Sequence, residues 1–338
     1  MQKPTSSILI IGTQRSGSNM LRLMLNQLPE IEAPHPPHLL QIFFPLIHVY
    51  GDLKNDSNFK KLIDDICCYV DANPVPWSNV ELGRITVFNR CTQRTLVEIS
   101  KVVYELKAEA KGASYWCCKS LANVYFIPEI ESGGLNPFYI HLIRDGRDVA
   151  ASFEKAIVGE KHIYLIAKQW KLEQELALSM TAKYAKDRTT TLRYEEFIRN
   201  PKVALTPILE RLGLEWSDEI LNFYQSEEAK RTAAAGDMWR NVVKPVDSTN
   251  MRHYSERLTQ EEILIFESVA GDMLVLLNYK LDNLTENLKA EFSNEEIASY
   301  HKQNDILKKE ARLKYAKDLA LRIPQENIIS EIKSVNIN

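Results

Sequence analysis

Short, continuously apolar runs alternate along the chain with longer segments that have helical periodicity. The clearest runs occupy residues 8–11 and 138–143, and each stops at a polar or small residue. Runs of this length and composition are typical of strands buried on both faces of a parallel sheet. The pattern therefore predicts a central parallel sheet with strands over 8–11, 114–118, 138–143 and 189–192.

The segments between these runs predict helices on both faces of the sheet. Residues 20–28 form a helix that ends at Pro29, whereas the Pro- and His-rich stretch 34–38 cannot be helical. Residues 227–250 are polar with few periodic apolar positions, which predicts a long mobile loop. Thr259 and Glu262 have the spacing of a capping box. Further helices are predicted over 57–71, 91–111, 148–152, 160–186 and 201–212. The fold class is therefore α/β.

The chain becomes charged and helix-prone from about residue 284, with a broken apolar stripe. We expect a main domain over 1–283 and a helical C-terminal extension over 284–338. The extension would pack on the body or on a partner subunit, so a homo-oligomer formed through this helix is one expectation.

The bulk composition narrows the class of protein. The 338 residues are 45% apolar and 26% charged, which is the balance of a soluble globular protein. A net charge of −3 gives no reason to expect nucleic acid as a partner. The five cysteines lack the spacing of a zinc site. The first apolar run is too short for a signal peptide or a membrane span. We expect a cytoplasmic protein with reduced thiols, no metal and no membrane partner.

A glycine-bounded loop follows the first strand. Residues 12–17, Gly-Thr-Gln-Arg-Ser-Gly, have the spacing at which backbone N–H groups and a helix N-terminus converge on a phosphate. Nucleotide-hydrolysing loops continue with Lys and then Ser or Thr, but here Ser18 and Asn19 follow, and the cation, Arg15, lies inside the loop. The loop predicts an anion site that works without the usual Lys–Mg²⁺ pair. The alternative is a glycine-rich turn that binds nothing.

A second strand, turn and helix carry another candidate anion site. Arg144 follows the strand over 138–143, and Ser152 lies one to two turns into the next helix. A guanidinium and a hydroxyl suit a phosphate monoester. Alternatively, Arg147 and Asp148 form a salt network at the helix terminus. Two anion sites at strand ends imply a ligand with two separated anionic groups. The donor 3′-phosphoadenosine 5′-phosphosulfate (PAPS) is such a ligand.

These segments resemble the motifs of PAPS-dependent sulfotransferases. The loop 12–19 is similar to the family's 5′-phosphosulfate loop, and 143–152 is similar to its 3′-phosphate motif. Segments 192–201 and 243–246 resemble later parts of the fold, so the likeness covers roughly 7–280. An arginine inside the loop is more similar to the tyrosylprotein and bacterial branches than to the cytosolic phenol and steroid branch.

The resemblance implies a phosphate-loop α/β fold that transfers a sulfuryl group from PAPS to a hydroxyl or amine of a small-molecule acceptor, without metal. Asn19 stands where the family often has Thr, and Met20 stands where the phenol branch has an adenine-stacking Trp. The resemblance implies that the cofactor-binding residues are Arg15, Ser16, Gly17, Ser18, Asn19, Arg144, Ser152, Tyr194 and Lys244.

The resemblance also implies catalytic residues, with Arg15 stabilising the leaving group. Lys119 has the place of a lysine near the reacting centre in the tyrosylprotein branch, although it could be a solvated charge at a strand end. His35 has the place of that branch's glutamate, and its unperturbed pKa of ~6.5 suits a base. Otherwise His35 merely packs the Pro-rich turn, and His38 and Glu32 are alternative bases.

Two other functions remain open from the sequence. A nucleotide-dependent phosphotransferase is disfavoured by the missing Lys after Gly17. A catalytically silent nucleotide-binding protein would use residues 284–338 for assembly.

Overall fold

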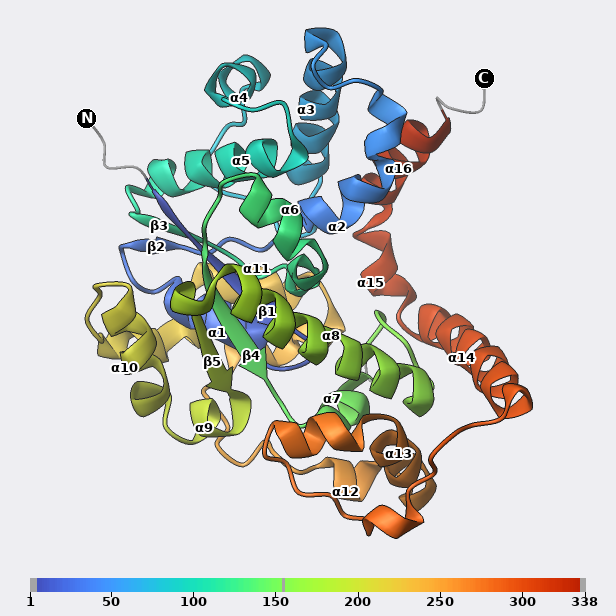
Figure 1. Ribbon diagram of the computed structural model, residues 1–338. Helices are drawn as coiled ribbons and strands as arrows, with labels where there is room; N and C mark the ends of the chain where they lie inside the picture. Colours follow the sequence, from blue (N-terminus) through green and yellow to red (C-terminus); the bar gives the residue numbers. More distant parts are fainter. Residues whose placement is uncertain (1–4, 154–155, 335–338) are drawn as a thin grey trace.

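A five-stranded parallel sheet forms the centre of the computed structural model, which describes residues 5–153 and 156–334 (Figure 1). The strand order is β2-β3-β1-β4-β5, and every neighbouring pair is parallel. The predicted α/β class is confirmed, and a strand lies at each predicted place. The two-residue strand β2, which the pattern did not predict, is too short to give a periodic signal. The strands are β1 (Ser6–Gly12), β2 (Ile31–Glu32), β3 (Tyr115–Cys118), β4 (Phe138–Ile143) and β5 (Thr189–Arg193).

Helices follow each strand and cover both faces of the sheet. The α-helices are α1 (Ser18–Leu25), α2 (Leu39–Phe43), α3 (Asp56–Asp71), α4 (Arg84–Arg90), α5 (Leu96–Lys111), α6 (Ile127–Ser132), α7 (Gly146–Phe153), α8 (Ile163–Tyr184), α9 (Tyr194–Arg199), α10 (Pro201–Arg211), α11 (Glu227–Ala234), α12 (Tyr254–Arg257), α13 (Gln260–Leu276), α14 (Asn294–Lys314), α15 (Ala316–Ala320) and α16 (Ile323–Ser334). The 3₁₀ helices are η1 (Phe44–Tyr50), η2 (Leu121–Phe126), η3 (Lys186–Arg188), η4 (Asp218–Gln225), η5 (Asp237–Val243) and η6 (Thr285–Asn287).

Strand β1 is buried on both faces, as its continuous apolar run predicts. Ile8 and Ile10 pack in a cluster with residues of α1 and α10, whereas Leu9 and Ile11 pack in a second cluster with residues of α3 and α5. Successive side chains of a strand point to opposite faces, so one strand supplies both layers of the core. No helix within the described ranges has both the length and the apolarity to cross a membrane.

The segment 227–250 is not the long loop that its polarity predicts. Residues 227–234 form α11 and residues 237–243 form η5, and only the remainder lacks regular structure. The Ser226 side chain accepts from the Ala229 N–H at the start of α11, and Ala229 and Thr232 are fully buried. A short helix can bury one small face while the rest of its surface stays polar, so composition alone predicted the wrong structure.

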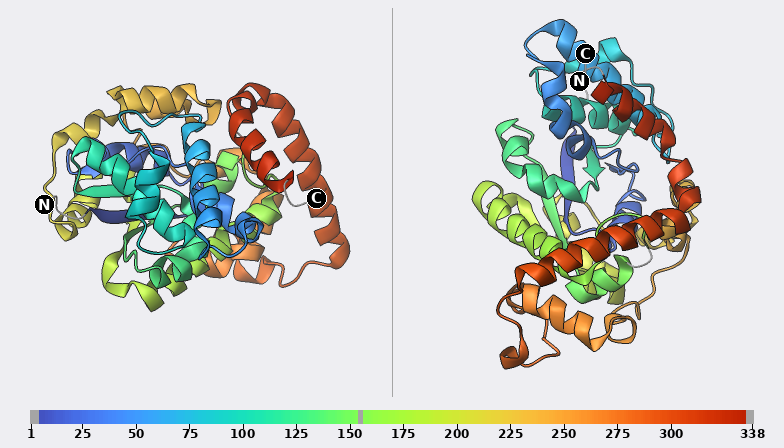
Figure 2. Two further views of the ribbon diagram at one scale, coloured as in Figure 1. Left: turned by 90° about the horizontal axis from the view of Figure 1, so that it is seen from above. Right: turned by 90° about the vertical axis from the view of Figure 1, so that its right-hand side faces the viewer.

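The described part of the C-terminal extension contains three α-helices and the short η6 in place of one helix. Figures 1 and 2 show α14, α15 and α16 running from the α13 end of the molecule towards α3. Asn304 of α14 accepts the N–H groups of Lys161 and His162 just before α8, and the Gln325 side chain donates to the Tyr69 carbonyl at the end of α3. The extension therefore packs on the body of its own chain. A homo-oligomer and the division at residue 284 stay predictions.

A buried ion-pair network anchors the end of β4. Arg147 lies in α7 and is 2% exposed; its guanidinium pairs with Asp145 at 2.8 Å and also with Glu267 of α13. Asp148 accepts the N–H groups of Arg252 and Tyr254. The sequence offered a salt network of Arg147 with Asp148 as an alternative; Arg147 does form a network here, but with Asp145 and Glu267 and not with Asp148. The network holds the turn after β4 against α12 and α13.

Replacing Arg147 tests how much this network stabilises the fold. Arg147→Ala leaves Asp145 and Glu267 buried without their cation, so we expect the free energy of unfolding to fall by about 3–5 kcal/mol. Urea unfolding followed by fluorescence measures the loss. As a control, Lys230→Ala removes an exposed pair with Glu227 and should leave the unfolding midpoint unchanged. Equal effects of the two substitutions would contradict the network's role.

Candidate active site

A cavity of about 1110 Å³ opens at the carboxyl edge of the sheet. Its wall includes residues that directly follow three strands, Lys119 after β3, Arg144 after β4 and Tyr194 after β5, and Arg15 from the loop after β1. Open parallel sheets bind ligands at this edge, where the polar ends of neighbouring strands meet. The strand order therefore brings together candidate residues that lie far apart in the sequence.

The loop between β1 and α1 leaves the helix N-terminus open. Gly17 has φ 87° at the start of α1, and a Cβ there would lie 2.5 Å from the Tyr194 ring, so only glycine fits. Helix α1 has no acidic residue in its first turn and no side-chain cap. Ser18 and Asn19 line the cavity, and Ser16 is fully buried. Among the described residues, Ser16 Oγ and Asn19 Oδ1 have no hydrogen-bond partner. This local geometry suits an anion.

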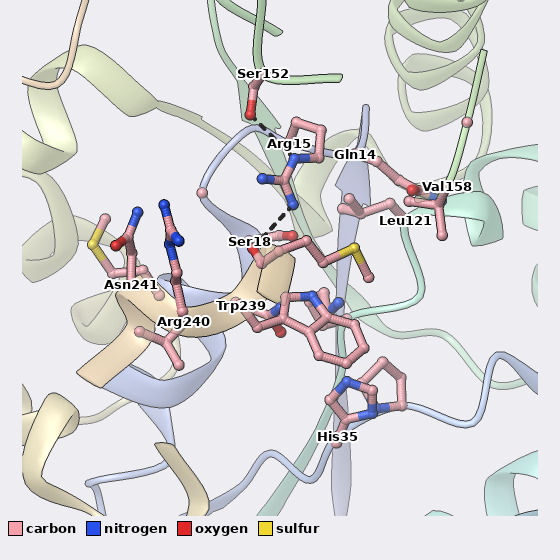
Figure 3. A pocket seen from close by; sticks show the side chains of 18 of the residues that line it. Gln14, Arg15, Ser18, His35, Leu121, Ser152, Val158, Trp239, Arg240 and Asn241 are labelled. Atoms are coloured by element: carbon pink, nitrogen blue, oxygen red, sulfur yellow. Dashed lines mark hydrogen bonds between the residues drawn. The ribbon is translucent and has the colours of Figure 1, made fainter. Parts of the chain in front are cut away.

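Arg15 links the two predicted anion sites (Figure 3). Its Nε donates to Ser152 Oγ at 3.1 Å and its Nη1 donates to the Met238 carbonyl at 3.4 Å. Arg144 Nη1 in turn donates to the Arg15 carbonyl at 3.0 Å. Burial, with the nearby Arg144 charge, lowers the pKa of Arg15 to about 10. Two cations thus share one water-poor site, which favours an anionic ligand between them.

Arg144 is held in place mainly by an aromatic ring and a backbone carbonyl. Its guanidinium stacks 4.2 Å from the centre of the Tyr194 ring and donates to the Asn250 carbonyl at 3.4 Å. The Asn250 side chain donates to the Tyr194 hydroxyl at 2.8 Å. The nearest carboxylate, Asp148, is 3.9 Å away and already accepts two backbone N–H groups. Lys244 also lines the cavity, from an exposed position.

His35 lies at the other end of the cavity and is 3% exposed. Within the described ranges neither ring nitrogen has a hydrogen-bond partner, and the ring meets Trp239 edge-on at 4.8 Å (Figure 3). Burial, followed by the charges of Arg22 and Lys119, lowers the pKa of His35 well below its ordinary value. The imidazole is therefore neutral, and its free nitrogen can accept a proton from a ligand.

His38 and Lys119 line the same end. His38 Nδ1 is 3.1 Å from Ser120 Oγ, and burial lowers the pKa of His38 to about 3. Lys119 is 7% exposed, so it is not the solvated strand-end charge that was its alternative. Burial, with Arg22 as the next cause, lowers the pKa of Lys119 to about 7.

Two other candidates have structural partners. Glu32 forms ion pairs with Lys107 at 3.1 Å and Lys111 at 3.7 Å and does not line the cavity. His141 is buried in β4, and its Nε2 lies 2.8 Å from Gln174 Oε1, as expected of a core histidine. The structure therefore separates Glu32 from the group formed by His35, His38 and Lys119.

The sequence profile of the sulfotransferase family matches residues 7–218. The chain belongs to the sulfotransferase family. The sulfotransferase domain from the Synechococcus PCC 7002 olefin synthase has 20% sequence identity to this chain and a TM-score of 0.52. The match covers 80% of this chain and 96% of that domain. The sulfotransferase domain from the curacin biosynthetic pathway has 19% sequence identity to this chain and a TM-score of 0.54. That match covers 83% of this chain and 100% of that domain. These likenesses establish a shared fold. The comparison with curated proteins gives no match.

The cavity of this sulfotransferase also contains residues that its sequence did not reveal. Trp239 of η5 faces His35, and the C-terminal extension contributes further wall residues. A buried tryptophan in a polar segment was the one available signal for η5, whereas no motif marks the extension. Within the described ranges no group of three or more His, Cys, Asp or Glu side chains could hold a metal ion. The extension residues in the wall are Lys314, Tyr315, Arg322 and Gln325.

The lowered pKa of Lys119 predicts that its amine is reactive near neutral pH. With a pKa of about 7, half of its amine is uncharged at neutral pH, so it should be acetylated faster than surface Lys230. Competitive labelling with acetic anhydride from neutral to alkaline pH, read by peptide mass spectrometry, measures the ratio. A Lys119 rate that keeps rising steeply well into alkaline pH would contradict the lowered pKa.

Proposed function

We propose that this chain transfers a sulfuryl group from PAPS to a hydroxyl or amine of a small-molecule acceptor, in the cytoplasm and without metal. The observation that carries the proposal is that Arg15 and Arg144 share one cavity with the open N-terminus of α1. Among the described residues Arg15 pairs with no carboxylate, and Arg144 has only Asp148, at 3.9 Å. Family membership supplies the reaction class, and the cation arrangement supports a donor with two anionic ends.

The residues present fit such a donor. The loop N–H groups, Ser16, Ser18, Asn19 and Arg15 would hold the 5′-phosphosulfate, because this loop combines an uncapped helix end with orphaned polar atoms. The 3′-phosphate would lie against Arg144 and Ser152. Arg144 Nε has no partner within the described residues and is free to donate. Tyr194 and Lys244 would complete the nucleotide site.

The proposed reaction is an in-line displacement at sulfur. The acceptor oxygen forms a bond to sulfur while the bond from sulfur to the 5′-phosphate oxygen breaks, and adenosine 3′,5′-bisphosphate (PAP) leaves with that electron pair. Positioning and electrostatic stabilisation carry such transfers. Arg15 and the loop N–H groups would stabilise the leaving phosphate. Lys119 would stabilise the sulfuryl group during its transfer.

His35 would take the proton of the acceptor hydroxyl. Its neutral ring and unpartnered nitrogens are the form that a base needs. Nearby cations contribute to its low pKa, so the negative charge of bound PAPS would raise that pKa towards the working range. His38 is the alternative base, although its Nδ1 already contacts Ser120.

A hydroxylated natural product is our proposed acceptor, since the two matched structures are named for an olefin synthase and a curacin pathway. A phosphotransferase would instead require ATP and Mg²⁺ for turnover. A catalytically silent protein would bind PAP and transfer nothing from ³⁵S-labelled PAPS to a broad acceptor panel.

Removing the Arg144 guanidinium tests the donor site. Arg144→Ala should weaken PAP binding by roughly 10- to 100-fold, the loss expected for hydrogen bonds to a charged group. Titration calorimetry measures the affinity for PAP. As a control, adenosine 5′-monophosphate, which lacks the 3′-phosphate, should bind to the wild type and to the variant with equal affinity. Unchanged PAP affinity in a folded variant would overturn the two-phosphate site.

Removing the His35 imidazole tests the base. His35→Ala should lower kcat by roughly a hundredfold or more, with little change in PAP affinity, because the ring acts on the acceptor proton. The same measurement on His38→Ala separates the two histidines. Normal turnover in His35→Ala would rule out His35, and a selective loss in His38→Ala would assign the role to His38.

A further inference from the structure

An arginine of the C-terminal extension enters the cavity wall near the proposed base. Arg322 lies in the turn between α15 and α16 and lines the cavity. Within the described ranges its guanidinium makes no hydrogen bond or ion pair, and its Nε is buried without a partner. The guanidinium lies against the Trp239 ring, 5.4 Å from the ring centre. A half-buried cation in this state retains its full capacity to bind an anion.

The position of Arg322 is fixed from both sides of the cavity. The Gln325 side chain donates to the Tyr69 carbonyl at 3.0 Å, which ties α16 to α3. The Asp318 carboxylate accepts the Asp237 N–H at 2.8 Å, which ties α15 to η5. Two contacts across the cavity hold the turn, so the guanidinium is presented by a supported segment and not by a free tail.

Arg322 lies beside the Trp239 ring, which also packs against His35 in the cavity wall. Its charge contributes to the lowered pKa values of His35, His38 and Lys119, so the four groups lie within electrostatic range of one another. The sulfuryl group is the proposed partner of Lys119. Arg322 is therefore a separate cation available to a different ligand group.

The cavity's acidic side chains have other partners. Glu160 contacts Lys308 and Asn304 of α14. Asp237 lies 3.7 Å from Arg240, and Asp247 accepts from Thr249. Among the described residues no carboxylate lies within ion-pair distance of Arg322. The Asp318 and Glu326 carboxylates are near enough to act on the pKa of Arg322, but neither forms an ion pair with it. A cation without an ion-pair partner in a partly desolvated wall favours an anionic ligand group over a neutral or cationic one.

We propose that Arg322 binds a carboxylate of the acceptor, so that the acceptors of this enzyme are hydroxylated carboxylic acids. The inference rests on the proposed sulfuryl transfer and adds the acceptor class. A planar guanidinium pairs with a carboxylate through two parallel hydrogen bonds, and one cation balances its single negative charge. The apolar surfaces of Ile42, Tyr69 and Trp239 in the same wall would cover the carbon skeleton.

Matched probes test the charge preference on the full chain saturated with PAP. The acids are 4-hydroxyphenylacetate and 6-hydroxyhexanoate, and each is compared with its methyl ester; tyramine supplies a cationic analogue. By titration calorimetry, wild type should bind the better acid roughly 10- to 100-fold more tightly than its ester, and tyramine least. Arg322→Gln should remove this difference, and Arg322→Lys should keep part of it. Sulfate transfer from ³⁵S-labelled PAPS should follow the same order.

The controls separate the acceptor site from the rest of the enzyme. Arg312→Gln changes an exposed arginine of the same extension and should keep the acid preference. PAP affinity should be equal in wild type and Arg322→Gln. Failure of wild type to bind PAP or to transfer sulfate would count against the proposed function itself. The acceptor proposal is overturned if neither acid binds, if acid and ester bind equally, or if Arg322→Gln keeps the preference.

Discussion

The rest of the site depends on one buried and one half-buried guanidinium group, Arg144 and Arg15, which meet at the loop between β1 and α1. Arg144 donates to the carbonyl of Arg15, whose backbone has a φ of 71°. In the part of the chain that the structure describes, Arg15 has no carboxylate partner and Arg144 has only Asp148, at 3.9 Å. Burying like charges costs several kcal/mol per ion unless other groups compensate. The compensation comes from elsewhere in the fold: Ser152, the Met238 and Asn250 carbonyls, and the Tyr194 ring. Binding of an anionic ligand would offset the rest of this free-energy cost.

The strand order makes this arrangement possible. Because β1 lies between β3 and β4, the loop after β1 is flanked by Lys119 on one side and Arg144 on the other. The clustering of cations at this edge of the sheet also explains the lowered pKa values of Lys119 and His38. Burial and the nearby cations hold the pKa of Lys119 at about 7 and that of His38 at about 3. A bound anion would raise both values, so donor binding and the protonation of the reacting end are coupled.

Much of this could be predicted from the sequence, because the relevant signals are local. Continuous apolar runs located the strands, and the 12–17 and 143–152 segments located cations that do line one cavity. The prediction of a loop over 227–250 was wrong. Helix α11 buries only a small face, which leaves little periodic signal, and Trp239 is buried by residues that are distant in the sequence. The contribution of Arg322 could not be predicted either. It depends on where α15 and α16 return across the body, and only tertiary packing decides that path.

The crystal structure of this chain with PAP is the most direct test of the shared cation site. We expect the 5′-phosphate in the loop between β1 and α1, within hydrogen-bond distance of its backbone N–H groups, and the 3′-phosphate against Arg144 and Ser152. Bound nucleotide with its 3′-phosphate away from Arg144, or no nucleotide in this cavity at saturating PAP, would contradict the shared cation site.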